Sequence, residues 1–167
     1  APEIHQWNRI IMNNTQILLR GPVRNYPGAE TIHGLFEERV RLHPDIGEVR
    51  FEGRSTSYSE VNAEANRLAG LLVERGIGCG DLVGVCLDPS VDLVVSLLAV
   101  LKVGAAFVPL DPTHPHDRIA HVVQDSGIKV LICSNGTSHC CPVGIPRMEI
   151  DAVQVELAGK SAANLGV

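Results

Sequence analysis

The sequence of 167 residues predicts an α/β fold, with a partial, doubly wound parallel sheet and flanking helices. Three observations support this fold class. Short apolar runs have the length of strands that are covered on both faces, segments with helical spacing separate them, and the connections are short. This alternation is typical of parallel strands joined by right-handed crossovers.

A helix and a hairpin come first. Apolar residues recur at helical spacing after Thr31, which can cap the helix, and Pro44 stops the pattern. Apolar and polar residues then alternate over 49–51 and again over 56–58, on either side of Gly53. Alternation around a glycine predicts a small hairpin.

The second helix is expected over 61–72, where apolar residues again repeat at helical spacing. Ser57 or Ser59 can cap its start, and Glu60 in the first turn suits the helix dipole. Gly76 ends the helix, because glycine readily adopts the left-handed conformation found after a helix.

Strands and helices then alternate. We expect three buried strands, followed by one more short strand. These strands cover Leu82–Leu87, Ala105–Leu110, Val130–Cys133 and Arg147–Ile150. One intervening helix covers about Pro89–Val103. The next helix begins with Thr113 as its cap or Pro115 as its first residue, and it ends at Ser126 before Gly127.

Composition and charge exclude several classes of function. The net charge is −5 and no long basic run occurs, which argues against nucleic-acid binding. No apolar stretch is long enough to span a bilayer, and no secretion leader pattern opens the sequence. The five cysteines are odd in number and scattered, as in a reduced, cytoplasmic protein.

Several motifs occur in one order along the chain. They are His5–Asn8, Thr31–Glu38, Phe51–Asn62, Ala65–Ala69, Gly80–Val85, Leu101–Pro112, Pro115, Arg118 and Asp125–Gly127. In this order they resemble the N-terminal part of a nonribosomal peptide synthetase adenylation domain, of the acyl-adenylate-forming superfamily. The segment Phe51–Asn62 is similar to the first core motif of that family, and Leu101–Pro112 is similar to nearly the whole second core motif.

The resemblance implies a domain organisation. Residues 1–30 would be a linker from an upstream condensation domain, residues 31–150 a truncated N-terminal adenylation subdomain, and residues 151–167 a tail. The complete family domain uses ATP and magnesium, and it works beside condensation and carrier-protein domains. Its phosphate loop, its ribose-binding Asp, its catalytic Lys and its amino-acid pocket follow the second core motif.

We therefore assign no catalytic, cofactor-binding or metal-binding residue to this sequence. The turn Ser134–Ser138 has the composition of a phosphate loop, but no Lys and no convincing helix follow it. The glycine-rich segment Gly76–Gly80 precedes a strand instead of a helix. The cluster His139–Cys141, together with Cys133, lacks paired zinc-ligand spacing. The residues His114, His116 and His121 do not share one helix face.

Three charged residues receive structural interpretations. Asp111 is expected to cap the next helix or to pair with Arg118. Glu60 and Lys102 are expected to make capping or surface contacts, because most charged residues on helices are solvated.

Two hypotheses about function follow. Residues 9–25 are longer and more irregular than the family's usual link, and Asp88–Val91 departs from its usual Glu-Arg-Ser-Pro. These departures favour a truncated, non-catalytic subdomain that serves as a scaffold or docking element. It should expose a strand edge or an apolar patch and so dimerise or bind a partner. The alternative is a fragment of a complete domain that activates an amino acid with ATP and loads it onto a carrier-protein thiol.

Overall fold

The computed structural model describes residues 31–44 and 46–166, and the predicted linker 1–30, with its Trp-Asn motif, lies outside them. The elements are α2 (Ile32–Leu42), β1 (Glu48–Phe51), β2 (Arg54–Ser57), α3 (Tyr58–Glu74), β3 (Leu82–Cys86), α4 (Val91–Lys102), β4 (Ala106–Pro109), α5 (His116–Ser126), β5 (Val130–Cys133), the 3₁₀ helix η1 (Ser138–Cys140), β6 (Arg147–Glu149) and α6 (Gln154–Ala158). The predicted α/β fold class is confirmed.

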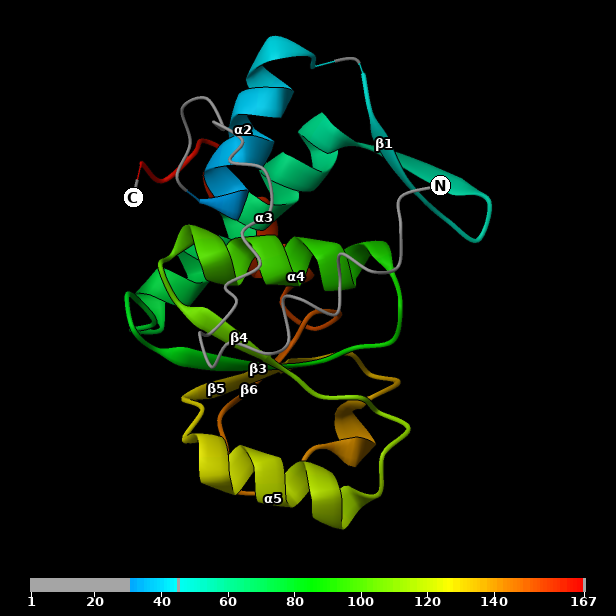
Figure 1. Cartoon of the computed structure of the whole chain (residues 1–167), viewed down its shortest axis with the longest axis vertical. Coiled ribbons are helices and arrows are strands. Elements are labelled where there is room, and N and C mark those ends of the chain that lie inside the picture. The colour runs from blue at the N-terminus through cyan, green and yellow to red at the C-terminus, as the bar shows by residue number, and fades with distance from the viewer. Residues whose placement is uncertain (1–30, 45, 167) are drawn as a thin grey trace, which may run out of the picture.

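The centre of the fold is a parallel sheet of four strands in the order β4-β3-β5-β6. Helix α4 lies against one face of this sheet and α5 against the other (Figure 1). Helix α2 and the antiparallel hairpin β1–β2 lie beyond α4, on the side away from the sheet, and α3 runs from the hairpin past α4 toward the sheet (Figure 1). Helices on both faces are what a doubly wound sheet requires.

The two central strands are apolar on both faces because each face meets a different core. Along β5, Val130 and Ile132 join a large hydrophobic cluster with α3 and α4, whereas Leu131 and Cys133 join a smaller cluster with α5. This alternation follows the period of two along a strand. The buried runs that the sequence shows for β3 and β5 are thereby explained.

Strand β4 differs from the prediction. The sequence suggests that Ala105–Leu110 is a buried strand like the other two, but β4 lies at one edge of the sheet and its four residues are exposed or half-buried. Within the described residues it pairs with β3 alone. An apolar sequence cannot distinguish a central strand from an edge strand, because strand order is decided by tertiary pairing.

The helix ends are mostly where the capping residues predict them. Thr31 and Ser57 are the N-caps of α2 and α3, and Gly127 takes a left-handed conformation with φ of 68° after α5. Helix α4 starts after Ser90, so its predicted start at Pro89 is too early. Helix α5 starts after Pro115, one residue later than expected for Pro115 as its first position.

The C-terminal region contains a helix for which the sequence shows no pattern. Residues 154–158 form α6, which has no side-chain cap. The flanking Val153 is buried in the large cluster and Leu157 packs against it. A helix of five residues is too short to show a periodicity, and packing stabilises it instead.

Candidate functional site

The carboxyl ends of the strands are the first place to look for a site, because open parallel sheets bind ligands there. Asp111 follows β4 and accepts hydrogen bonds from the backbone N and the hydroxyl of Thr113, at 2.9 and 2.7 Å. It neither caps α5 nor pairs with Arg118, so both interpretations of this residue are wrong. Short-range bonding within a turn competes with capping for an Asp side chain.

The serine- and threonine-rich turn after β5 uses its polar groups internally. The buried hydroxyl of Thr137 donates to the carbonyl of Cys86 at 2.6 Å and accepts from the backbone N of Ser134 at 3.0 Å. The backbone N of Asn135 donates to Asp151 at 2.6 Å. These bonds occupy donors that a phosphate loop would direct at its ligand, so the turn does not fit a nucleotide phosphate.

Three cysteines gather at the same end of the sheet. Cys86, Cys133 and Cys141 are buried, and all five cysteines of the chain carry free thiols. A hydrogen bond that Cys133 donates to Cys141, followed by burial, raises the pKa of Cys133, and the hydrogen bond with Cys86 and burial raise the pKa of Cys141 to about 12. The hydrogen bond with Cys141 lowers the pKa of Cys86, whereas Cys133 and Cys141 are held protonated, and protonated thiols are poor nucleophiles and poor metal ligands. Across residues 31–44 and 46–166, no cluster of His, Cys, Asp and Glu could hold a metal ion.

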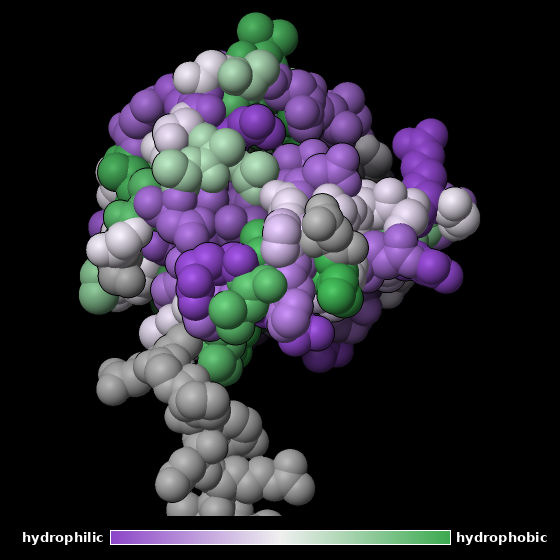
Figure 2. Space-filling model, turned by 90° about the horizontal axis from the view of Figure 1, so that it is seen from above, coloured by the Kyte–Doolittle hydropathy of each residue, from purple (hydrophilic) through white to green (hydrophobic). Residues whose placement is uncertain are grey.

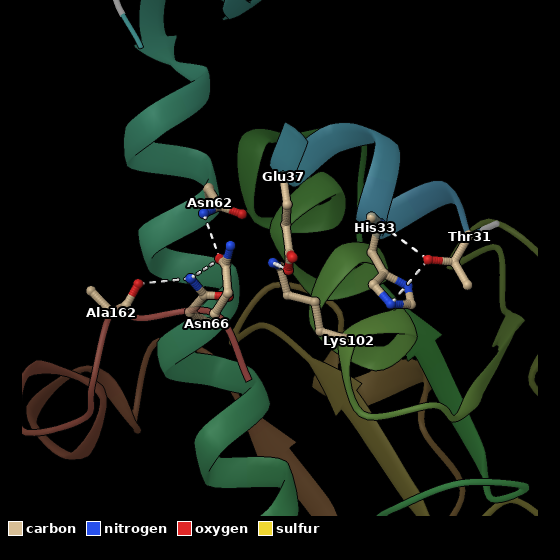
Figure 3. Close-up of polar contacts among 9 residues, drawn as sticks. Thr31, His33, Glu37, Asn62, Asn66, Lys102 and Ala162 are labelled. Carbon is tan, nitrogen blue, oxygen red and sulfur yellow. Dashed lines mark hydrogen bonds and ion pairs between the residues drawn. The ribbon is translucent and has the colours of Figure 1, made fainter. Parts of the chain in front are cut away.

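The main polar feature of the structure is a layer of buried side chains among α2, α3, α4 and the C-terminal segment (Figure 3). Lys102, in the last turn of α4, is 1% exposed and forms an ion pair with Glu37 of α2. The expectation that Lys102 makes a surface contact is therefore wrong. Glu60, by contrast, accepts from the backbone N of Ser57 at 2.8 Å in a capping box, as expected.

The second part of this layer fixes the C-terminal segment to α3. Asn62 and Asn66, one helical turn apart on α3, donate to the side-chain oxygen of Asn164 at 3.0 and 2.9 Å. Asn66 also donates to the carbonyl of Ala162 at 2.7 Å (Figure 3). The Oδ1 atoms of both α3 residues are buried and have no partner in the described part of the chain.

Burial dominates the electrostatics of the charged part of this layer. It lowers the pKa of Lys102, and the bond to Glu37 opposes that change. It also lowers the pKa of His33, which lies near both charges and approaches the hydroxyl of Thr31 at 3.3 Å. Removing an ammonium from water is costly unless a counter-charge is close. The layer can therefore position helices, because Lys102 pairs with Glu37 and the amides of the two α3 asparagines bind the C-terminal segment.

A groove lies on the opposite side of α3. A cavity of about 240 Å³ is lined by α3, α4 and α6, with Glu64, Arg67 and Asp92 around an apolar floor. Burial, followed by the charge of Asp92, raises the pKa of Glu64. The sequence shows no signal for this groove, because α6 is a short helix without a pattern.

Comparison with protein families shows the family to which the chain belongs. The family model described as AMP-binding enzyme matches residues 36–164. The chain belongs to this family of AMP-binding enzymes. The expected resemblance to the N-terminal part of a nonribosomal peptide synthetase adenylation domain is confirmed.

Similar curated proteins include surfactin and tyrocidine synthases. The chain is 46% identical over 119 residues to surfactin synthase subunit 2 of Bacillus subtilis (strain 168), which covers 71% of this chain and 3% of that protein. It is 35% identical over 156 residues to tyrocidine synthase 1 of Brevibacillus parabrevis, which covers 93% of this chain and 14% of that protein. The chain thus spans a small part of the relatives it matches.

Solved structures show the same fold. The nonribosomal peptide synthetase FmoA3, bound to alpha-methyl-L-serine-AMP, matches with a TM-score of 0.75 and 25% identity over 86% of this chain and 16% of that chain. The Klebsiella oxytoca NpsA N-terminal subdomain matches with a TM-score of 0.70 and 23% identity over 81% of this chain and 34% of that chain.

Proposed function

We propose that this chain is a non-catalytic structural and docking subdomain of a nonribosomal peptide synthetase adenylation domain. The observation that carries the proposal is the edge strand β4. Its residues are exposed or half-buried, and among the described residues one of its sides is unpaired. An open strand edge is a template for pairing with another chain or domain.

The polar groups support a structural role. The turn Ser134–Ser138 uses its hydroxyls and amides internally, so it does not fit the phosphates of ATP. The buried layer around Lys102 and the asparagines of α3 holds helices together. ATP and magnesium belong to the complete family domain, and this chain would serve that domain as a scaffold.

The proposed partners are neighbouring parts of a synthetase, such as condensation and carrier-protein domains. One solved relative is an artificially fused adenylation–PCP di-domain from Klebsiella oxytoca, of which this chain covers 25%. The proposal retains residues 1–30 as a linker from an upstream condensation domain, residues 31–150 as the subdomain and residues 151–167 as its tail. The five free thiols support a reducing, cytoplasmic compartment.

The second candidate function is that of a fragment of a complete, catalytically active adenylation domain. The family match extends without interruption over residues 36–164, and identity to the surfactin synthase relative reaches 46%. A fragment of a complete domain that activates an amino acid with ATP, and loads it onto a carrier-protein thiol, would show this similarity.

Exchange of labelled pyrophosphate into ATP tests both candidates. The pure chain of 167 residues, given ATP, magnesium and a mixture of amino acids, should show no exchange above the amino-acid-free background. Robust exchange by the pure chain would overturn the non-catalytic proposal. A chimera that carries this chain in place of the matched segment of tyrocidine synthase 1 separates the candidates. Exchange by that chimera would show that the chain can form part of an active domain, as the second candidate requires, and loss of exchange in a folded chimera would contradict the second candidate.

A further inference from the structure

Helix α2 is attached to the rest of the molecule in an unusual way. It lies across α3 and α4 (Figure 1), but none of its residues is buried. Its apolar contact is made by half-buried Phe36, whose ring centroid lies 5.3 Å from that of Tyr58. A helix normally gains its stability from an apolar face that packs on a core. This contribution is small for α2.

Val40 is half-buried as well, whereas the other three apolar residues of α2 do not attach it. Ile32 is 71% exposed, and Leu35 and Leu42 are also exposed. Seen from above, the end of the molecule that carries α2 has a hydrophilic surface with separate apolar side chains (Figure 2). The described chain leaves these three side chains in solvent, so they do not oppose release of the helix.

Among the described residues, the polar attachment of α2 to the rest of the molecule is the ion pair between Glu37 and Lys102. The two partners differ in burial, because Glu37 is 22% exposed and Lys102 is 1% exposed. As long as α2 is in place, the Lys102 ammonium cannot be hydrated and depends on Glu37 as its counter-charge. When α2 moves away, the ammonium regains water, and this hydration offsets much of the lost attraction.

From this geometry we infer that α2 is a releasable latch over a cryptic modification site, the amine of Lys102. Release of α2 admits an activated acyl donor to an amine that is otherwise enclosed. The released ammonium first loses a proton to water, the neutral amine nitrogen then attacks the acyl carbon, an amide N–C bond forms as the bond from the acyl carbon to the leaving group breaks, and the second proton goes to water. The amide product is neutral and cannot pair with Glu37, so acylation holds the latch open.

Two measurements on the full chain test the latch. N-hydroxysuccinimidyl acetate labels lysines, and peptide mass spectrometry gives the rate at each one. Lys102 should be labelled roughly a hundredfold more slowly than Lys129, whose side chain is 57% exposed. Hydrogen exchange should show that the amides of α2 open separately from, and faster than, those of α3 and β5.

The variant Glu37→Gln removes the counter-charge with little change of shape. It should raise both the labelling rate of Lys102 and the exchange rate of α2 by about tenfold, while β5 exchanges at its original rate. The matched control is Glu38→Gln, which breaks the exposed ion pair with Arg41 and should change neither rate. The variant Glu37→Asp retains the charge and should restore part of the protection.

The outcomes decide the inference. Equal changes in α2 and β5 would show that the pair supports the whole fold, and the latch would be wrong. Unchanged labelling of Lys102 in Glu37→Gln would also overturn it. The inference does not depend on the proposed function, since the pyrophosphate exchange assay and the labelling assay measure different properties of the chain.

Discussion

Helices α2 and α4 are of similar length and similarly capped, but they are held in opposite ways. Thr31 accepts from the N of Gly34 at 3.1 Å, and Ser90 accepts from the N of Leu93 at 3.1 Å. Helix α4 buries half of its residues, 6 of 12, between the sheet and α3, whereas α2 buries none. A cap and a periodic sequence suffice to form a helix, but burial decides how firmly it is attached.

The comparison also separates two uses of polar residues. On α4, the single buried charge is Lys102, at the end that faces α2. The large cluster between α3, α4 and the sheet is built from apolar side chains, most of them aliphatic, and does not include Lys102. Burial of apolar side chains stabilises the molecule as a whole. A buried ion pair adds little net stability and mainly determines which elements pack together.

The largest effect is expected in the core beneath α4. Leu72 of α3 is fully buried in the large cluster, so Leu72→Ala should lower the free energy of unfolding by about 2–5 kcal/mol. Leu35→Ala in α2 is the matched change at an exposed position and should cost less than about 0.5 kcal/mol. Urea unfolding measures both. Equal losses in the two variants would contradict the difference between these regions.

A smaller effect is expected at the N-caps. Ser57 accepts from the N of Glu60 at 3.2 Å and starts α3, which supplies six buried residues to the large cluster, so Ser57→Ala should cost about 1 kcal/mol of global stability. Thr31→Ala removes the corresponding cap of α2. It should leave the unfolding free energy nearly unchanged and accelerate hydrogen exchange in α2 alone. A large decrease in the global free energy of unfolding in Thr31→Ala would show that α2 stabilises the whole fold, and would contradict this prediction.

The smallest effect concerns pH. Burial lowers the pKa of His33 below its ordinary value of 6.5, and the titratable groups that face it are Glu37 and Lys102. Above that value His33 is neutral whether α2 is docked or released. As pH falls below 6.5, the released helix binds a proton that the docked helix resists, so docking weakens.

Hydrogen exchange measures this effect of pH on α2. Protection of α2, corrected for the intrinsic exchange rate, should be lower at about pH 5.5 than at about pH 7.5. The variant His33→Gln should lose most of this dependence. If the protection of α2 still depends on pH in this variant, a group other than His33 is responsible.

Much of the fold could be predicted from the sequence. The strands β3 and β5 and the helix α3 show clear periodicities, and the caps Thr31, Ser57 and Gly127 lie where the residue types indicate. The position of β4 at the sheet edge could not be predicted, because an edge strand and a central strand can both be apolar. Helix α6 could not be predicted either, because it is short and depends on packing.

The buried polar layer shows why site residues are harder to predict than elements. Lys102 ends a helix, a position where lysines are usually solvated. It is buried because α2, which lies 65 residues earlier in the sequence, covers it with Glu37. Asn62 and Asn66 are likewise buried by residues 162–164, about a hundred positions later. The local sequence around these residues does not indicate that segments far away in the chain bury them.

The sequence alone determines which segments become helices and strands and to which family the chain belongs, because caps, periodicity and motif order are local properties. Tertiary structure alone decides which strand is the edge, which lysine is buried and which helix can be released. These properties depend on contacts between segments far apart in the chain, where burial changes the free energy of a charge far more than its neighbours in sequence do.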